Sequence, residues 1–356
     1  MKKLMQTEDG KAVVLVVGLT ALVSILLLAF ALPGVHSKPD DLPLAVVAPA
    51  TTADRIVGAL DARQPGAFDV HVVADETQAR EQILQRDVDG AIVVGPQGVT
   101  ALVATAAGPS VATLIQGVAQ GMATSMHQPY TTVDVRGFGS GDPKGVGLSA
   151  GALPLALGGW IGGVVLMMML RRPRTLVLAT IGFAVVASAT LIVLLRYVTG
   201  TFDANFGYLW LAGILGLAAT AFTVIGLRSL LGGAGLALAA IILVLLGNPL
   251  SGLTSSPDLL PKPWGAFGQL LPPGSLGTLL RNVGFFGGHH ITHPIVVLTV
   301  WLVLGLALYA IAVRRHVDIT ADDDLIDEAI GVEPHHDAHP AEVASAPVGT
   351  PGRHER

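Results

Sequence analysis

Six apolar stretches of this sequence, each about long enough to cross a bilayer, contain no Asp, Glu, Lys, Arg or His. They lie at residues 12–32, 147–170, 175–195, 208–227, 231–247 and 294–313. Because the hydrocarbon core of a membrane needs roughly 20 apolar residues in a helix, the pattern predicts an α-helical integral membrane protein with six transmembrane helices. Charges inside a membrane mark proton and ion paths, so uncharged spans argue against a proton-coupled transporter.

Basic residues near the ends of these stretches predict their orientation. They are Lys2, Lys3, Lys11, Arg171, Arg172, Arg174, Arg228, Arg314 and Arg315. The positive-inside rule assigns them all to the cytoplasm, so both termini are expected there, including residues 1–11 and a disordered tail at 314–356. The alternative for the first stretch is a cleaved signal peptide, but its apolar run of about 20 residues exceeds the 7 to 15 typical of one.

Composition agrees with a protein of the cell membrane. Hydrophobic residues make up 51% of the chain and charged residues 13%, which fits no soluble class. The net charge of −5 is concentrated outside the apolar stretches, and it gives no indication of a nucleic-acid partner. Since there is no cysteine, disulfides, iron–sulfur clusters and thiol catalysis are excluded.

The more polar segment 33–146 predicts a small extracytoplasmic α/β domain between the first two spans. Continuous apolar runs at 42–48 and 89–94 indicate buried strands, and the alternating segment 68–73 indicates another strand. Residues 51–63 and 75–85 indicate helices between them. Weaker patterns suggest a strand at 100–106, a helix at 109–126 and a strand at 131–136. Strands that alternate with helices predict a mainly parallel sheet.

This domain has no sequence features of an enzyme. Ala48, Pro49 and Ala50 occupy the turn where a glycine-rich phosphate loop would follow the first strand. The polar residues at 69–76 are explained by strand alternation and by a helix cap at Asp75. We therefore expect neither a catalytic site nor a bound cofactor.

Several phrases of the sequence are characteristic in combination: VDGAIVVGPQGVTAL at 88–102, LPLALGGWIGG at 153–163, and LLPKPW, LLPPGSLGTLLRN and FF within 259–286. With these phrases the chain resembles the permeases of ABC type-2 exporters, and more closely the phage-infection-protein (YhgE/Pip) branch of that superfamily. The resemblance implies a membrane subunit that dimerises, with itself or with a related chain, and a separate ATPase subunit that would bind ATP. It covers the chain up to about Arg315 and implies no particular substrate.

One departure concerns the contact with an ATPase. Such permeases usually place a cytoplasmic docking helix between their second and third spans, whereas here the link is about four residues with Pro173 inside it. So short a turn cannot form a helix of its own. Arg171, Arg172 and Arg174 remain the candidate contacts with a cytoplasmic partner.

Two overlapping GxxxG patterns occur in the second span, at Gly158, Gly159, Gly162 and Gly163. Small residues at this spacing let another helix approach closely. They indicate either a dimer seam or pore-lining helix, or ordinary packing within one bundle.

The long connection at 248–293 is apolar but too short to cross the membrane twice. Trp264 suits headgroup depth, Pro272, Pro273 and Gly274 are expected to break a helix, and Ser275 is expected to cap a short one through Asn282. The segment is either a re-entrant hairpin that forms an outer gate or a folded outer lid. His289, His290 and His293 follow it as weak metal candidates, because no carboxylate or cysteine lies nearby to complete a site.

The sequence thus predicts a permease-like subunit that exports an amphipathic or lipid-like substrate, with membrane lipid and an ATPase subunit as partners. The alternative is a non-transporting scaffold or receptor that assists a secretion or cell-envelope complex. The short link after the second span favours the alternative, and the gate-like outer segment favours export.

Overall fold

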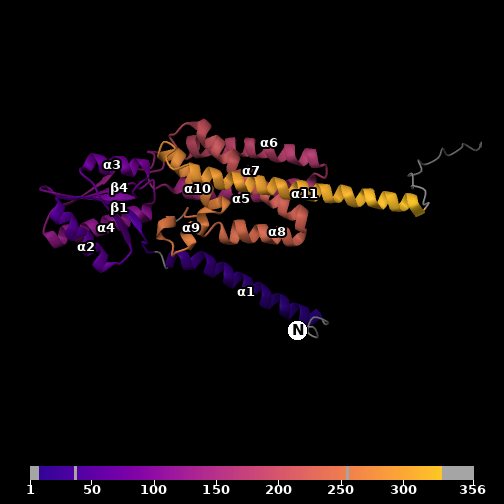
Figure 1. Ribbon diagram of the computed structural model, residues 1–356, viewed down its shortest axis with the longest axis horizontal. Coiled ribbons are helices and arrows are strands. Elements are labelled where there is room, and N and C mark those ends of the chain that lie inside the picture. The colour runs from indigo at the N-terminus through magenta and orange to yellow at the C-terminus, as the bar shows by residue number, and fades with distance from the viewer. Residues whose placement is uncertain (1–7, 36–37, 254–255, 331–356) are drawn as a thin grey trace, which may run out of the picture. The chain divides into compact units, whose positions relative to one another are not determined.

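The computed structural model describes residues 8–35, 38–253 and 256–330, and it divides the chain into two units. The first unit, residues 1–312, contains a mixed α/β domain and a set of apolar helices (Figure 1). The second unit starts at Val313, and its described residues belong to the end of helix α11 (Thr292–Ile330). The predicted tail beyond residue 330 and the predicted cytoplasmic residues 1–7 lie outside the described part of the chain.

A five-stranded mixed sheet forms the α/β domain, in the order β2-β1-β3-β4-β5. Its strands are β1 (Leu42–Val47), β2 (Phe68–Val72), β3 (Gly90–Gly95), β4 (Gly98–Val103) and β5 (Tyr130–Asp134). Only β3 and β4 pair in antiparallel fashion, through a tight turn in which Gly95 faces Gly98. The interior strand β1 is buried over most of its length, as expected for a strand covered on both faces.

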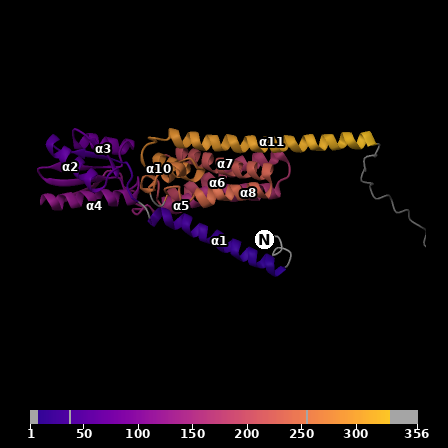
Figure 2. The same ribbon diagram turned by 60° about the horizontal axis from the view of Figure 1, so that its bottom comes forward.

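Helices cover both faces of this sheet (Figure 2). Helices α2 (Ala50–Arg63) and α4 (Pro109–Met126) share one apolar core with Leu44 and Ile92, and α3 (Glu76–Gln85) packs on the opposite face against Ala45 and Leu102. The first turn of α3 is capped by Asp75, whose Oδ1 accepts a hydrogen bond from Gln78 N at 2.8 Å. The expected strands and helices of this domain are all present, within a few residues of their predicted ends.

The apolar part of the first unit is built around one central helix. Its longer elements are α1 (Glu8–Val35), α5 (Val146–Met169), α6 (Pro173–Val193) with the π-helical turn η2 (Leu194–Val198), α7 (Phe206–Leu231), and α8 (Gly233–Ala240) with η3 (Ile241–Leu246). Helix α7 packs against α5, α6 and α8. In its most apolar window 78% of residues are buried, against 28% for α6 and 17% for α11, so α7 is the core helix.

A helical hairpin follows η3. It consists of the 3-10 turn η4 (Pro257–Leu259), α9 (Trp264–Gln269) and α10 (Pro272–Phe285), and we call α9 and α10 the outer hairpin. The helix break expected at Pro272 and Pro273 falls just before them, between α9 and α10, and both prolines occupy the first turn of α10. Proline is tolerated there because first-turn N–H groups have no partner within the helix. The cap expected at Ser275 is wrong, because Leu271 is the N-cap residue and Ser275 lies inside the helix.

The prediction of six transmembrane helices around a small domain is wrong. Within the described residues, three helices are long and apolar enough to cross a membrane: Pro173–Val198, Phe206–Leu231 and Thr292–Arg315. The helix Gly233–Leu246 supplies only about 21 Å at 1.5 Å per residue, less than the hydrocarbon thickness of about 30 Å. The described apolar stretch of α5, Leu157–Met169, is similarly short. Helix α1 is the first expected span, and the structure does not describe several of its side chains.

The sheet also differs from the expected one. Its five strands form one continuous mixed sheet, which is more extensive than expected of a small domain. Three of the four strand pairings are parallel, in keeping with a mainly parallel sheet, and the β3–β4 pair is antiparallel. The antiparallel pairing follows from the connection between β3 and β4, which is too short for the crossover that a parallel pair needs.

Candidate functional site

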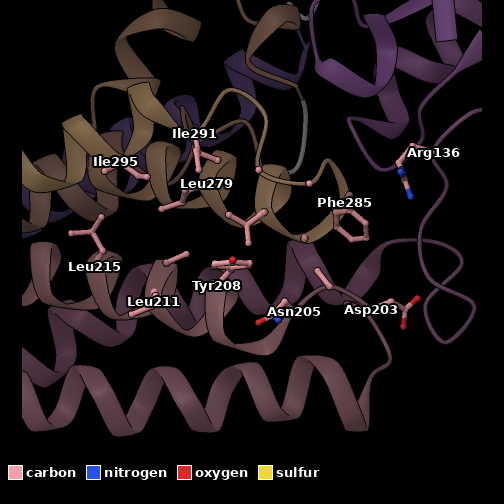
Figure 3. Close-up of a pocket in the computed structure, with 16 residues that line it drawn as sticks. Arg136, Asp203, Asn205, Tyr208, Leu211, Leu215, Leu279, Phe285, Ile291 and Ile295 are labelled. Atoms are coloured by element: carbon pink, nitrogen blue, oxygen red, sulfur yellow. The ribbon is translucent and has the colours of Figure 1, made fainter. Parts of the chain in front are cut away.

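A cleft of about 810 Å³ lies between the first half of α7, the second half of α10 and the start of α11. It is lined by Arg136, Asp203, Ala204, Asn205, Tyr208, Leu211, Ala212, Leu215, Leu279, Val283, Gly284, Phe285, Gly287, Gly288, Ile291 and Ile295. Figure 3 shows apolar side chains such as Leu211, Leu279 and Ile291 along its interior, whereas Arg136 and Asp203 stand apart from each other at the end beyond Phe285. Asn205 lies beside Tyr208. The cleft is therefore amphipathic, with an apolar interior and a polar mouth.

Close packing between α10 and α7 shapes the inner wall of the cleft. A Cβ atom placed on Gly216 of α7 would lie 2.4 Å from Leu276 Cδ1, and one on Gly284 of α10 would lie 2.5 Å from the ring of Phe202. Leu276 lies beside Gly216 and Gly284 lies near Leu209, so the two helices run antiparallel. These glycines let α10 approach α7 closely and leave the cleft on their other side.

The loop before α7 fixes the polar mouth. Phe202 is fully buried and its ring centroid lies 5.4 Å from that of Phe285, while Arg196 donates a hydrogen bond to Ala204 O. Asn205 caps α7 by accepting a hydrogen bond from Gly207 N at 2.8 Å. Asp203 lies between these anchored residues, and its side chain is exposed.

The outer hairpin is tied to α11 at its tip. Trp301 Nε1 donates a hydrogen bond to Leu270 O at 2.8 Å, nine residues into α11. At about 1.5 Å per residue, the tip therefore reaches about 14 Å along α11 from Thr292. Within the hairpin, Ser275 Oγ donates to Gln269 O at 2.6 Å, and Thr278 Oγ1 donates to Gln269 Oε1 at 2.6 Å.

Buried charges join the α/β domain to the other end of this hairpin. Arg86 and Asp89 come from the turn between α3 and β3, and Arg281 comes from α10. Burial, with the nearby charge of Asp258, raises the pKa of Asp89 from its usual value to about 6, although Arg86 and Arg281 oppose the shift. Burial together with the charge of Arg86 lowers the pKa of Arg281 to about 10, so its guanidinium stays protonated at neutral pH.

Two further contacts reinforce this junction. The Arg86 guanidinium lies 5.1 Å from the ring centroid of Phe286, and His290 Nε2 lies 3.2 Å from Asp87 Oδ1. Arg281 Nη2 donates a long hydrogen bond of 3.4 Å to Gly252 O, and its Nε atom is buried without a partner among the described residues. We call Arg86, Asp89, Asp258 and Arg281 the junction cluster.

The predicted site residues fall in separate places. Gly159 and Gly163 face α7, because a Cβ on either would come within 3.0 Å of a main-chain oxygen of Leu217 or Ala221. Gly158 lies near Leu217, and Gly162 contacts the Phe183 ring of α6. This side of α5 is therefore occupied by helices of the same chain.

The predicted cytoplasmic contacts lie on a three-residue link, Leu170–Arg172, and the start of α6. Arg171, Arg172 and Arg174 are all exposed, and Arg172 precedes the first turn of α6. Trp264 starts α9 with its side chain 48% exposed, while Pro272, Pro273 and Gly274 are buried.

Of the metal candidates, His290 faces Asp87, and His289 and His293 are exposed. No group of three His, Asp or Glu side chains that could hold a metal ion occurs among the residues described. Asp69 and His71 form an exposed pair, with 3.1 Å between Oδ2 and Nε2.

No family model, curated protein or solved structure matches this chain. The cleft and the junction cluster were not found from the sequence. Asp203 and Arg281 are isolated charges in otherwise apolar phrases, and that isolation could have marked each of them singly. Arg136, two residues after Asp134, has no such signal, and none shows which residues come together.

Proposed function

We propose that this protein is a permease-like membrane subunit that binds an amphipathic or lipid-like molecule in the cleft and moves it outward. The observation that carries the proposal is the cleft itself, whose apolar interior and polar mouth match the two ends of such a molecule. Clefts of about 300–1,000 Å³ lined mainly by apolar side chains are typical of small-molecule sites. The resemblance to ABC type-2 exporter permeases agrees with this role.

In this proposal the outer hairpin is the gate. Its helix α10 forms one wall of the cleft, so displacement of α10 would change access to it. The hairpin contacts α11 through Trp301 and the α/β domain through the junction cluster. A partner or ligand that moved the α/β domain would therefore act on the gate directly.

We place the protein in the cell membrane as a multi-pass protein, with the α/β domain on the extracytoplasmic side. Support comes from the three helices that are long and apolar enough to span, and from the basic residues Arg171, Arg172 and Arg174. A separate ATPase subunit and a second permease chain are the proposed partners.

The second candidate is a scaffold or receptor that does not transport. It is favoured by the link between α5 and α6, which is only Leu170–Arg172 and contains no helix that could dock into an ATPase. Affinity purification of the full chain separates the two candidates. Recovery of a stoichiometric ATPase, lost when Arg171, Arg172 and Arg174 are replaced by Ala, supports the permease, and recovery of envelope components without an ATPase supports the scaffold.

Binding in the cleft can be tested by photolabelling. The full chain in maltoside detergent is irradiated with a lysophospholipid that carries a diazirine in its acyl chain, and labelled peptides are identified by mass spectrometry. We expect labelling of α7 and α10, reduced about fivefold by Leu211→Trp, which fills the cleft from a side chain that is 59% exposed. The matched control is Leu178→Trp on α6, which is 69% exposed and does not line the cleft. Equal labelling of all apolar helices, unchanged by Leu211→Trp, contradicts the proposal.

A further inference from the structure

Opposite charges stand at the mouth of the cleft without pairing to each other. Arg136 follows β5, and Asp203 belongs to the loop before α7. Both side chains are exposed, and among the residues described no ion pair or hydrogen bond engages the guanidinium of Arg136 or the carboxylate of Asp203. Figure 3 shows the two side chains on different segments at the same end of the cleft.

Both charges are held in place by their main chains. Arg136 O accepts a hydrogen bond from Ala106 N at 3.1 Å, which ties this residue to the end of β4. Across the mouth, a Cβ atom on Gly139 would lie 3.2 Å from Asp203 Oδ2, so the carboxylate lies against the same connector that carries Arg136. The mouth of the cleft therefore has one positive and one negative side chain, carried by two segments that meet at Gly139.

Other carboxylates in this region are already engaged. Asp134 accepts hydrogen bonds from Thr105, at 3.2 Å from N and 2.6 Å from Oγ1, and Asp142 accepts from Gly147 N at 2.7 Å. Their roles are structural, because they fix the end of β5 and the start of α5. Asp203 differs from them in being available to a ligand.

We propose that the cleft selects an amphipathic molecule whose head carries both a phosphate and an amine, such as a zwitterionic phospholipid. Arg136 binds the phosphate, since a guanidinium donates two parallel hydrogen bonds to it, and Asp203 binds the ammonium group. The apolar interior at Leu211, Leu215 and Leu279 receives an acyl chain. The charges of Arg136 and Asp203 sum to zero, so a head group of zero net charge complements both of them. An anionic head group is instead repelled by the carboxylate of Asp203.

This inference rests on the proposed binding function, so its test separates the two. The probe is the same diazirine-bearing lysophospholipid with an ethanolamine head, and unlabelled competitors share one acyl chain length. They are lysophosphatidylethanolamine, lysophosphatidylglycerol and a primary alkylamine, and soluble glycerophosphoethanolamine tests the head without a chain.

In the wild type we expect the ethanolamine lipid to compete about five- to tenfold better than the glycerol lipid or the amine, as two half-exposed charge contacts would allow. Arg136→Gln weakens competition by both phospholipids, whereas Asp203→Asn weakens only the ethanolamine lipid and improves the glycerol lipid. Competition by soluble glycerophosphoethanolamine that is weakened in both variants supports head recognition and identifies a free head group as a sufficient ligand. If it does not compete, the lipid is the ligand, and the difference between the lipid heads decides the inference.

Equal competition by all heads, unchanged in both variants, overturns the inference. In that case α7 and α10 could still be labelled, and Leu211→Trp could still reduce the labelling. The cleft would then bind amphipathic molecules without recognising the head group, and the proposed function would stand while the proposed head-group selectivity fails. Loss of specific labelling in the wild type instead overturns the proposed function.

Discussion

Arg86 and Asp89 form an ion pair with 3.2 Å between Nη1 and Oδ1, and only 15% and 10% of their side chains are exposed. Arg86 adopts a left-handed backbone conformation with φ of 68° at the end of α3, which turns the chain so that its side chain reaches both Asp89 and Phe286. Removing two charges from water is costly, and a pair regains this cost only where the remaining polar atoms are also satisfied. The unpartnered Nε atom of Arg281 leaves the junction cluster incompletely satisfied.

The first prediction concerns the pH dependence of the junction. The pKa of Asp89 rises from 3.8 in the unfolded chain to about 6 in the fold, so between these values the folded protein holds a proton that the unfolded chain releases. The resulting stability is fully present below pH 3.8 and is lost as pH rises through 6. Asp89→Asn mimics the protonated form, and we expect it to stabilise the junction at pH 7.5 by at most about 3 kcal/mol.

Hydrogen exchange of α3 and β3 amides in the full chain, at pH 5 and pH 7.5 and corrected for intrinsic rates, measures this effect. The variant should protect these amides more than the wild type does at pH 7.5 and about equally at low pH. His290→Gln is the control, because His290 is another titratable side chain at this contact and is exposed. Protection that changes with pH in the same way in wild type and Asp89→Asn would show that Asp89 is not the titrating group.

A second prediction follows from Arg281, whose positive charge lowers the pKa of Asp89. Arg281→Met removes that charge, so the pKa of Asp89 should move above 6 and the pH-dependent loss of protection should shift upward. Arg281→Lys retains the charge and should shift the transition less. An unchanged midpoint in Arg281→Met would mean that the two side chains do not interact.

A third prediction tests the close contact between α5 and α7. A Cβ atom on Gly159 would lie 2.7 Å from both Leu217 O and Thr220 Cβ, and neither atom is the end of a flexible side chain. Gly159→Ala should therefore destabilise the helix pair by about 1–3 kcal/mol and lower the melting temperature in detergent. Gly182→Ala on α6 is the matched control, because nothing lies within 4 Å of its Cβ position, and it should leave the melting temperature unchanged. Equal effects of the two substitutions would argue against the packing.

Local patterns predicted the α/β domain well. The continuous apolar run that became β1 and the Asp75 cap of α3 depend on neighbours within a few residues, and such signals can be read from one sequence. The pairing of β4 with β3 depends on a turn in which Gly98 has φ of 127°, and this turn produces the antiparallel pair of a sheet that was predicted to be mainly parallel.

The apolar half was harder to predict, because hydropathy does not distinguish a spanning helix from a buried one. The run at 231–247 is interrupted by the π-helical turn η3 and ends too soon, and the helix expected to be capped by Ser275 starts earlier, at Pro272. The cleft and the junction cluster join residues far apart in the chain, such as Arg136 with Ile291, or Asp89 with Arg281. One sequence contains no local signal for such contacts.

The last prediction concerns the anchor of the outer hairpin. Trp301 Nε1 donates its hydrogen bond to Leu270 O at the hairpin tip, so Trp301→Phe keeps most of the ring volume and removes only the donor. Hydrogen bonds between helices in membrane proteins are worth about 0.6 kcal/mol on average, so we expect about threefold faster hydrogen exchange in α9 and the first turn of α10. Trp264→Phe on α9 is the matched control: its ring is 48% exposed and contacts Phe267 at 6.1 Å between centroids. If the hairpin gates the cleft, Trp301→Phe should also speed the release of a cleft-bound probe, and Trp264→Phe should not. Faster hydrogen exchange without faster release of the probe would show that the hydrogen bond of Trp301 anchors the outer hairpin but that the hairpin does not gate the cleft.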